Sequence, residues 1–255
     1  MADRAALRAR VCVRALLPLV EPLARGDARA RAACEGPPFS ALVAGGEAAA
    51  TLVVGGGAAR VERGAGAADV QLVFGSEGAL ADFFAGRPAL PRASALRSPL
   101  LLARTLRLLA RLRILDPRSR VAPDEAALYT RLVLRFVARG VAELARPGGD
   151  PDAARLAARS PDRVYQWRVA ETGEAAWVRF ASGRVGVGVG AHPTRAPFVE
   201  TLFPTTAAAC RVLGGATSRM ESVARGDVES VGSPEYARKV SVLAQRLDAL
   251  VRGDA

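Results

Sequence analysis

The sequence predicts an α+β fold made of two tandem copies, each a mainly antiparallel β-sheet covered by helices. Half of the 255 residues are hydrophobic, which is enough to bury a core in one large domain or in two of ordinary size. Landmarks recur in the same order in the two halves, and each half runs from a helix through short strands to a second helix. We therefore place copy one at residues 1–117 and copy two at residues 118–255.

The repeat is visible in three aligned segments and in the spacing of single residues. "AALRARVCVRALLPLVEPLARGD" matches "AALYTRLVLRFVARGVAELARPGGD", "GEAAATLVVGGGAARV" matches "GEAAWVRFASGRV", and "SPLLLARTLRLLARL" matches "SPEYARKVSVLAQRLDAL". Between them, Phe74 precedes Gly86 by the same interval as Phe203 precedes Gly215. A sequence rich in alanine and arginine produces chance matches easily. Landmarks that keep their order favour a true repeat over coincidence.

Each copy opens with a helix, expected at Arg4 to Arg25 and at Asp124 to Arg146. Apolar residues cover a broad face of both segments, as in a helix that packs on a core. Pro18 and Pro22 lie inside the first segment, and a proline in a helix interior removes a hydrogen bond and clashes with the preceding turn. The first opening helix is therefore expected to kink or break.

Short strand-like runs separated by turn residues follow each opening helix. The turns are "GGE" and "GGG" in copy one, and "ETGE" and "SG" in copy two. Because the loops are too short for crossovers, we expect an antiparallel meander in each copy. The expected strands are Phe39 to Val43, Ala50 to Val54, Ala59 to Arg63 and Asp69 to Phe74, then Val164 to Ala170, Ala176 to Phe180, Arg184 to Val189 and Pro197 to Phe203.

A short apolar helix, one more strand and a closing helix complete each copy. The extra strand is expected in "RGDVESVG" of copy two, with "RPALPRASAL" as its poorer counterpart in copy one. Both closing helices begin at Ser-Pro. Ser98 and Ser233 can cap free amide groups of the first turn, while Pro99 and Pro234 lose no hydrogen bond at the first helical position.

This order of elements resembles the sterol carrier protein type-two family of lipid-binding domains. The residues that carry the resemblance lie in "DVQLVF" and "ADFFAG", where a strand with an Asp-Val-x-Leu pattern precedes a small helix that ends at a glycine. Copy two, with "APFVETLF", lacks the aspartate. The matching residues are Asp69, Val70, Leu72, Phe74, Leu80 and Gly86.

The resemblance implies a curved sheet covered by helices, with an apolar tunnel between them for a sterol or fatty-acyl chain. Its walls would come from apolar residues of the strands and the short and closing helices, although such residues more often form a filled core. The missing pattern in copy two puts ligand binding there in doubt. The candidate ligand-binding residues are Phe74, Phe83, Phe84, Leu101, Leu108, Leu109 and Leu112 in copy one, and Phe198, Phe203, Leu213, Leu243 and Leu247 in copy two.

The closing helix of copy one carries several arginines and no acidic residue between Arg97 and Arg113. Arg104, Arg107 and Arg111 on such an amphipathic helix could contact anionic lipid headgroups transiently while a carrier loads at a membrane. The alternative is a helix packed on the sheet with a solvated arginine face. Both interpretations stay open.

Enzyme chemistry has little support in the sequence. His192 is the only histidine and lies in "GAHPTR", an expected loop, and no metal-spaced cluster or Walker-type loop is present. The glycines of "SGRVGVGVGAHPTR" precede two prolines and no expected helix, so they do not form a phosphate-binding loop; they leave one face of a strand bare. No cofactor is expected. The widely separated cysteines Cys12, Cys34 and Cys210 suit buried thiols.

The formal net charge of +11 is spread over both halves, with arginine as almost the sole basic residue. Such a surface attracts polyanions without selecting among them. Aromatic residues make up 5% of the chain and do not interleave with basic segments, so no specific nucleic-acid partner is expected. No uncharged apolar run is long enough to span a membrane, and the default location is cytoplasmic.

The function expected from these observations is a non-enzymatic lipid carrier that holds an apolar ligand such as a sterol, a fatty-acyl lipid or a quinone. The alternative is a structural or scaffold protein with closed cores, or an accessory protein that assists a lipid- or quinone-modifying pathway. The oligomeric state, the ligand and the pathway are not encoded in any residue that we can identify.

Overall fold

The computed structural model describes residues 4–95, 98–116 and 121–253. Contacts between Cα atoms divide the chain into two compact units. Unit 1 consists of Met1–Asp116 together with Ala249–Ala255, and unit 2 consists of Pro117–Asp248. The expected second copy runs to residue 255, whereas the residues from 249 onward belong to unit 1.

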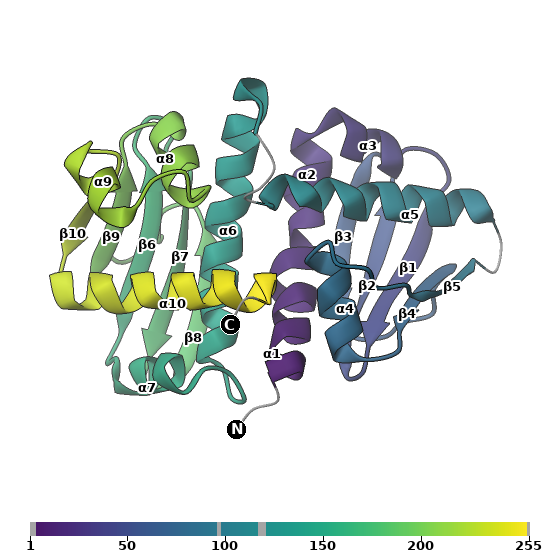
Figure 1. Ribbon diagram of the computed structural model, residues 1–255, viewed down its shortest axis with the longest axis horizontal. Helices are drawn as coiled ribbons and strands as arrows, with labels where there is room; N and C mark the ends of the chain where they lie inside the picture. The colour runs from purple at the N-terminus through teal and green to yellow at the C-terminus, as the bar shows by residue number, and fades with distance from the viewer. Residues whose placement is uncertain (1–3, 96–97, 117–120, 254–255) are drawn as a thin grey trace. The chain divides into compact units, whose positions relative to one another are not determined.

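Each unit contains one five-stranded sheet, and the two sheets have the same strand order (Figure 1). The order is β3-β2-β1-β4-β5 in unit 1 and β8-β7-β6-β9-β10 in unit 2. The first sheet comprises β1 (Phe39–Gly45), β2 (Ala48–Gly55), β3 (Ala58–Arg63), β4 (Val70–Phe74) and β5 (Arg92–Ala95). The second comprises β6 (Arg163–Val169), β7 (Ala175–Ala181), β8 (Arg184–Val189), β9 (Val199–Phe203) and β10 (Glu229–Gly232).

The expected strands are all present, but the antiparallel meander is wrong for the fourth strand of each unit. β1 pairs with β4 in parallel, and β6 pairs with β9 in parallel, while the other neighbouring strands are antiparallel. After β3, which is an edge strand, the chain crosses over β2 and β1 and forms β4 on the far side of β1. In the same way it passes from β8 over β7 and β6 to form β9 beside β6. A loop too short to hold a helix is therefore long enough for this crossover.

The helices of unit 1 begin with a broken opening segment. An α-helix gives way at Cys12–Leu16 to a π-helical turn, then at Leu17–Leu19 to a 3₁₀ turn that contains Pro18. This confirms the expected break and follows from the missing proline amide. The helices are α1 (Arg4–Val11), α2 (Val20–Gly26), α3 (Ala28–Cys34), α4 (Glu77–Phe84) and α5 (Pro99–Arg111), followed by a 3₁₀ turn at Leu112–Leu115.

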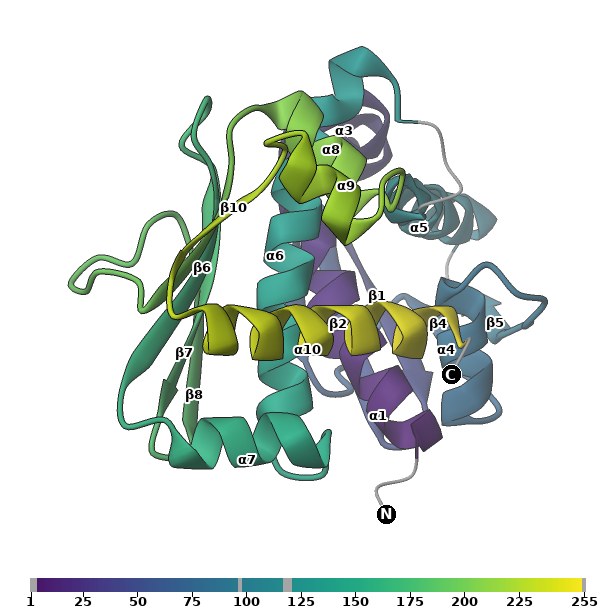
Figure 2. The same ribbon diagram turned by 60° about the vertical axis from the view of Figure 1, so that its left-hand side comes forward.

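The opening helix of unit 2 is continuous because no proline interrupts it. A 3₁₀ turn at Pro123–Glu125 leads directly into it. Figure 2 shows the sheet of this unit nearly edge-on, with α6, α8 and α10 on one face and the loop between β8 and β9 on the other. The helices are α6 (Ala126–Ala145), α7 (Pro151–Arg159), α8 (Thr206–Leu213), α9 (Arg219–Ala224) and α10 (Pro234–Arg252).

The core of each unit lies between its sheet and the opening helix. Alternate residues of the strands are buried because successive side chains point to opposite faces. In unit 1 these include Val43, Leu52 and Leu72, and in unit 2 they include Tyr165 and Phe180. Burial of these side chains against α1 and α2, or against α6, supplies most of the apolar contact that holds each sheet.

The bare glycine face of β8 is covered by Trp177 of the neighbouring strand. Gly188 pairs with Trp177 across the ladder, and a Cβ atom at Gly188 would overlap the indole ring. His192, from the loop between β8 and β9, packs against the same ring in a tilted arrangement, with centroids 4.5 Å apart. The glycines therefore make room for an aromatic side chain of the same sheet, and the histidine closes over it.

Candidate functional site

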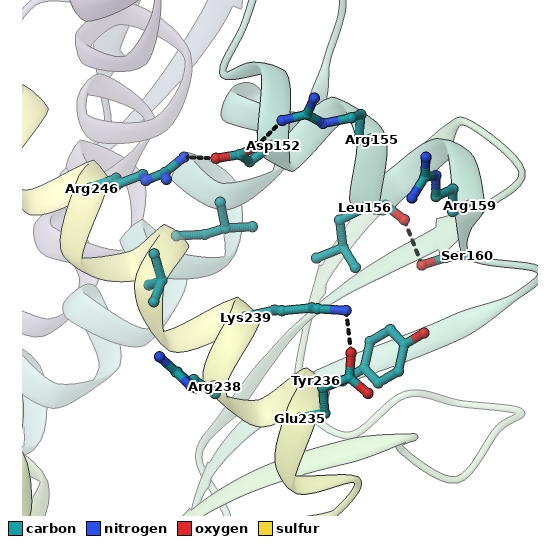
Figure 3. A pocket seen from close by; sticks show the side chains of 12 residues that line it. Asp152, Arg155, Leu156, Arg159, Ser160, Glu235, Tyr236, Arg238, Lys239 and Arg246 are labelled. Carbon is teal, nitrogen blue, oxygen red and sulfur yellow. Dashed lines mark hydrogen bonds and ion pairs between the residues drawn. The ribbon is translucent and has the colours of Figure 1, made fainter.

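A pocket of about 510 Å³ lies in unit 2 between α7 and α10 (Figure 3). Its volume falls within the range of pockets that hold small organic ligands. The lining residues come from these two helices and from Ser160, which follows α7. They are Asp152, Arg155, Leu156, Arg159, Ser160, Glu235, Tyr236, Arg238, Lys239, Val242, Leu243 and Arg246.

The α7 wall of the pocket is fixed by its N-terminal cap. The Asp150 carboxylate accepts hydrogen bonds from the amides of Asp152 and Ala153, each 2.9 Å long, and Pro151 occupies the first helical position. Both features favour helix initiation. The Arg246 guanidinium of α10 contacts Asp150 at 3.0 Å and Asp152 at 2.6 Å, so it joins the two helices at one end of the pocket.

The floor of the pocket is apolar and its rim is basic. Leu156 projects toward the space beside α10, as Figure 3 shows. Leu243 of α10 is also in the lining and is 3% exposed. The aromatic ring of Tyr236 forms one end, where the Arg163 guanidinium lies 4.2 Å from its centroid. An apolar floor with charges at the opening suits a ligand that has a hydrocarbon part and a polar head.

Ion pairs neutralise only part of the rim. Lys239 contacts Glu235 at 2.5 Å along α10, and Arg155 pairs with Asp152. Hydrogen bonds from Lys239 lower the pKa of Glu235, and those from Arg155 and Arg246 lower the pKa of Asp152. Both carboxylates therefore stay ionised at neutral pH.

Arg159 and Arg238 have no ion-pair partner among the residues that the structure describes. Both side chains are exposed at the rim of the pocket. Of the seven charged residues in the lining, five are basic and two are acidic. The rim thus carries an excess of positive charge, which attracts an anionic group.

Among the predicted ligand-binding residues, Leu243 lines this pocket. Phe198 is adjacent to it, because its ring packs edge-on against Tyr236 with centroids 5.3 Å apart. Leu247 packs on α6, where a Cβ atom at Gly140 would overlap its side chain. The others lie outside the pocket lining. Buried in the core are Phe74, Leu108, Leu109, Leu112 and Phe203, and half-buried are Phe83, Phe84, Leu101 and Leu213. The structure leaves their role as ligand contacts a prediction.

The α7 wall was not predicted from the sequence. The stretch "DPDAARLAAR" that forms it begins with an aspartate followed by a proline, which is a common start of a helix. That signal could have identified α7. It could not have shown that a pocket separates α7 from α10, since pockets depend on side-chain packing between distant segments.

The prediction that Arg104 contacts a membrane is wrong. Arg104 is 7% exposed, and its guanidinium donates hydrogen bonds to the carbonyl oxygens of Ala33 and Pro37, each 3.1 Å long. It also lies over the ring of Phe39, 4.7 Å from the centroid. The side chain points into unit 1 because the two carbonyl oxygens accept its hydrogen bonds and the ring of Phe39 packs against its guanidinium.

The two other predicted membrane-contact residues differ from Arg104 and from each other. Arg111 contacts Asp27 at 2.5 Å, and its side chain is 23% exposed. Arg107 is exposed. Among the described residues, none of the helices combines the length and the apolarity needed to cross a membrane.

The described part of the chain contains no group of three or more His, Cys, Asp or Glu side chains that could hold a metal ion. His192 packs against Trp177 and lies near Arg179, Arg195 and Asp162. Its pKa is below the ordinary value because burial and the two arginines disfavour the charged ring. These neighbours give the histidine a packing role on the sheet.

No family model matches the chain, and no curated protein matches it. Two sterol carrier structures are similar to part of it. Palmitated SCP2L2 from Aedes aegypti is 22% identical with a TM-score of 0.25, over 37% of this chain and 85% of that one. Sterol Carrier Protein 2 from Yarrowia lipolytica, in its apo form, is 12% identical with a TM-score of 0.28, over 40% of this chain and 92% of that one.

The sec-alkylsulfatase Pisa1 from Pseudomonas sp. is also similar to part of the chain. It is 12% identical with a TM-score of 0.26, and the match covers 55% of this chain and 27% of that one. Scores of this size carry no argument about function, so the site must be interpreted from its own residues.

Proposed function

We propose that the chain is a non-enzymatic carrier that holds one amphiphilic, lipid-like ligand in the pocket between α7 and α10. The observation that carries this proposal is the pocket itself, with its volume of about 510 Å³, apolar floor and basic rim. A fatty-acyl chain with an acidic head fits this distribution better than a sterol or a quinone, because neither of those offers a charge to the arginines.

The energetics favour such a ligand. Each methylene group that moves from water to an apolar floor contributes about 0.8 kcal/mol. Arg159 and Arg238 add an electrostatic attraction for the head, and because both are exposed, that attraction is modest and sensitive to salt. Affinity would therefore come mainly from the chain, and orientation from the head.

We also propose that units 1 and 2 are tandem copies of one sterol-carrier-like domain. The shared strand order, including the parallel central pair, supports this proposal. So does the cap at the start of α3 and α7, where Asp27 and Asp150 each accept a hydrogen bond from a helix amide. The resemblance in "DVQLVF" and "ADFFAG" supports the choice of family.

Uptake of a fluorescent fatty acid tests the carrier proposal. We expect pyrene-labelled dodecanoic acid to bind the purified chain at one site. Val242→Trp places a large ring in the pocket and should weaken uptake at least tenfold. Gln245→Trp adds the same ring at an exposed position of α10 outside the lining and should leave uptake unchanged.

Native mass spectrometry and organic extraction of the purified protein would identify a ligand that co-purifies. An acidic acyl lipid that is lost in Val242→Trp would support the carrier. If the folded chain neither retains a lipid nor takes up the probe, the carrier proposal fails and a scaffold with closed cores replaces it. Liposome flotation with Arg107→Gln tests membrane contact separately.

A further inference from the structure

The two units contain the same pair of helices beside the sheet, joined in the same way. In unit 1, Arg111 of α5 contacts Asp27 at the start of α3; in unit 2, Arg246 of α10 contacts Asp150 at the start of α7. Arg111 follows Ser98 by the same interval as Arg246 follows Ser233. By this alignment, Lys239 is the residue of unit 2 that corresponds to Arg104 of unit 1.

The space between these helices is filled in unit 1. α3 packs directly against α5, and the buried side chain of Arg104 occupies the gap between them. Its Nε donates to the Ala33 carbonyl near the end of α3, and its Nη1 donates to the Pro37 carbonyl. The guanidinium also lies beside Gly36, where a Cβ atom would be 3.6 Å from Nη1, an ordinary contact.

In unit 2, the residues that correspond to the surroundings of Arg104 do not make the same contacts. Leu156 corresponds to Ala33, and its carbonyl accepts the Ser160 hydroxyl at 2.7 Å. Arg163 occupies the strand position of Phe39, so a cation stands where unit 1 has an aromatic ring. Lys239 turns along its own helix to Glu235. The space is left open, and it is the pocket described above.

Burial of the charged Arg104 side chain is less favourable than burial of an apolar side chain at the same place would be. Arg104 has no acidic partner among the described residues, and its buried Nη2 has no hydrogen-bond partner. Burial of a charge without a counter-ion is destabilising because the group loses its hydration, and an apolar side chain of similar volume would fill the space without that loss. Close packing alone therefore does not account for an arginine here.

We propose that Arg104 is a plug in the unit 1 counterpart of the ligand pocket, and that this one side chain keeps the space between α3 and α5 closed to a ligand. The inference rests on the proposed function of the unit 2 pocket. It assigns a latent second site to unit 1, between α3 and α5, that takes the same class of amphiphile once the arginine is removed.

Binding stoichiometry tests the plug. We expect the unaltered chain to bind one equivalent of pyrene-labelled dodecanoic acid, and Arg104→Ala to bind two. Leu106→Ala, a truncation of an exposed residue on the same helix, should still bind one. A folded Arg104→Ala chain that binds one equivalent would count against the plug, whereas an unaltered chain that binds none would instead sink the proposed function.

The rate of thiol modification tests, without any lipid, whether Arg104 closes the space between α3 and α5. Cys34 is fully buried at the end of α3, close enough to Arg104 for that charge to influence its pKa. We expect N-ethylmaleimide to modify Cys34 at least tenfold faster in Arg104→Ala, while Cys12, also fully buried, stays protected. Mass spectrometry distinguishes the two thiols. Equal protection of Cys34 in both chains overturns the inference.

Arg104→Leu serves if Arg104→Ala does not fold. Leucine keeps apolar contact with Phe39 but is shorter than arginine and makes no hydrogen bond to Ala33 or Pro37. We expect a smaller opening, seen as faster modification of Cys34 by at least threefold. No change in a folded Arg104→Leu chain would again reject the plug.

Discussion

Units 1 and 2 share a sheet order and a helix pair, but they differ in what lies between the helices. Unit 1 closes this space with Arg104, and unit 2 leaves it as a pocket with a basic rim. The backbone plan is therefore compatible with either a filled core or a cavity. We infer that a few side chains decide which of the two forms between these helices.

The open faces of the two sheets differ as well. Thr51 of β2 and Trp177 of β7 occupy corresponding positions, each paired with the residue opposite it on the first strand. Thr51 accepts the Gly66 amide at 2.9 Å, so the crossover loop lies directly on the sheet. Trp177 instead contacts the ring of His192 from the corresponding loop, with centroids 4.5 Å apart.

The largest effect is expected from the ion pairs that join the helices. Arg111→Ala should lower the free energy of unfolding by about 2–3 kcal/mol, because it strips Asp27, which is 7% exposed, of its partner. Arg246→Ala should cost less, since its partners are more exposed. Urea unfolding followed by circular dichroism measures both. Equal losses of unfolding free energy in the two variants would contradict the expectation that the more buried ion pair contributes more to stability.

Substitutions of two glycines on the same face of β8 should differ in their effect on stability. Gly188→Val should lower the free energy of unfolding by about 1–3 kcal/mol, because its side chain would overlap the Trp177 ring. Gly186→Val is the matched control: its Cβ would lie 3.7 Å from the ring, an ordinary contact. Thermal unfolding of the two variants gives the comparison, and a Gly188→Val chain as stable as its control would contradict the packing.

The fold was predictable wherever local patterns determine structure. The break at Pro18, the long α6 and the strand positions follow from proline and from apolar periodicity. The parallel pairing of β1 with β4 was not predictable from loop length, because a crossover loop and a hairpin loop can have the same number of residues. The sequence marks turns, but sheet order is decided by long-range packing.

The site was predictable only in part. Leu243 was expected to line a lipid pocket as part of what the family resemblance implies, and it lines the pocket between α7 and α10. Arg104 was misplaced because an arginine on an amphipathic helix is usually solvated. Its burial depends on the Ala33 and Pro37 carbonyls and on Phe39, which are distant in sequence. Helical spacing does separate the two arginines: Arg104 lies one turn before buried Leu108 at the edge of the apolar face, whereas exposed Arg107 lies nearly opposite that face.

Removal of the unpaired rim charges should give a smaller, ligand-dependent effect. We expect Arg159→Gln combined with Arg238→Gln to weaken binding of the pyrene-labelled fatty acid about two- to tenfold, because two exposed attractions are lost. Binding of the corresponding methyl ester should not change. Fluorescence titration measures both ligands. A similar loss for acid and ester would mean that the arginines do not recognise the head.

The smallest effect is expected from His192. Its pKa is below 6.5 in the folded chain, because burial and the nearby Arg179 and Arg195 disfavour the charged ring. The unfolded chain therefore binds a proton more readily, so stability is full above pH 6.5 and falls as the pH drops below it. Urea unfolding at pH 7.5 and 5.5 should show a small loss that His192→Gln removes. An equal loss in the variant would assign it to other groups.

The crossover loops also have a consequence for amide hydrogen exchange. The Gly66 amide donates to the Thr51 hydroxyl, and the His192 amide donates to the Gln166 side chain at 3.0 Å. Loop amides normally exchange fast, but these two can exchange only when the loop leaves the sheet. The exchange rate of each amide therefore reports how often the crossover loop of its own unit leaves the sheet. Both exchange rates can be measured in one sample.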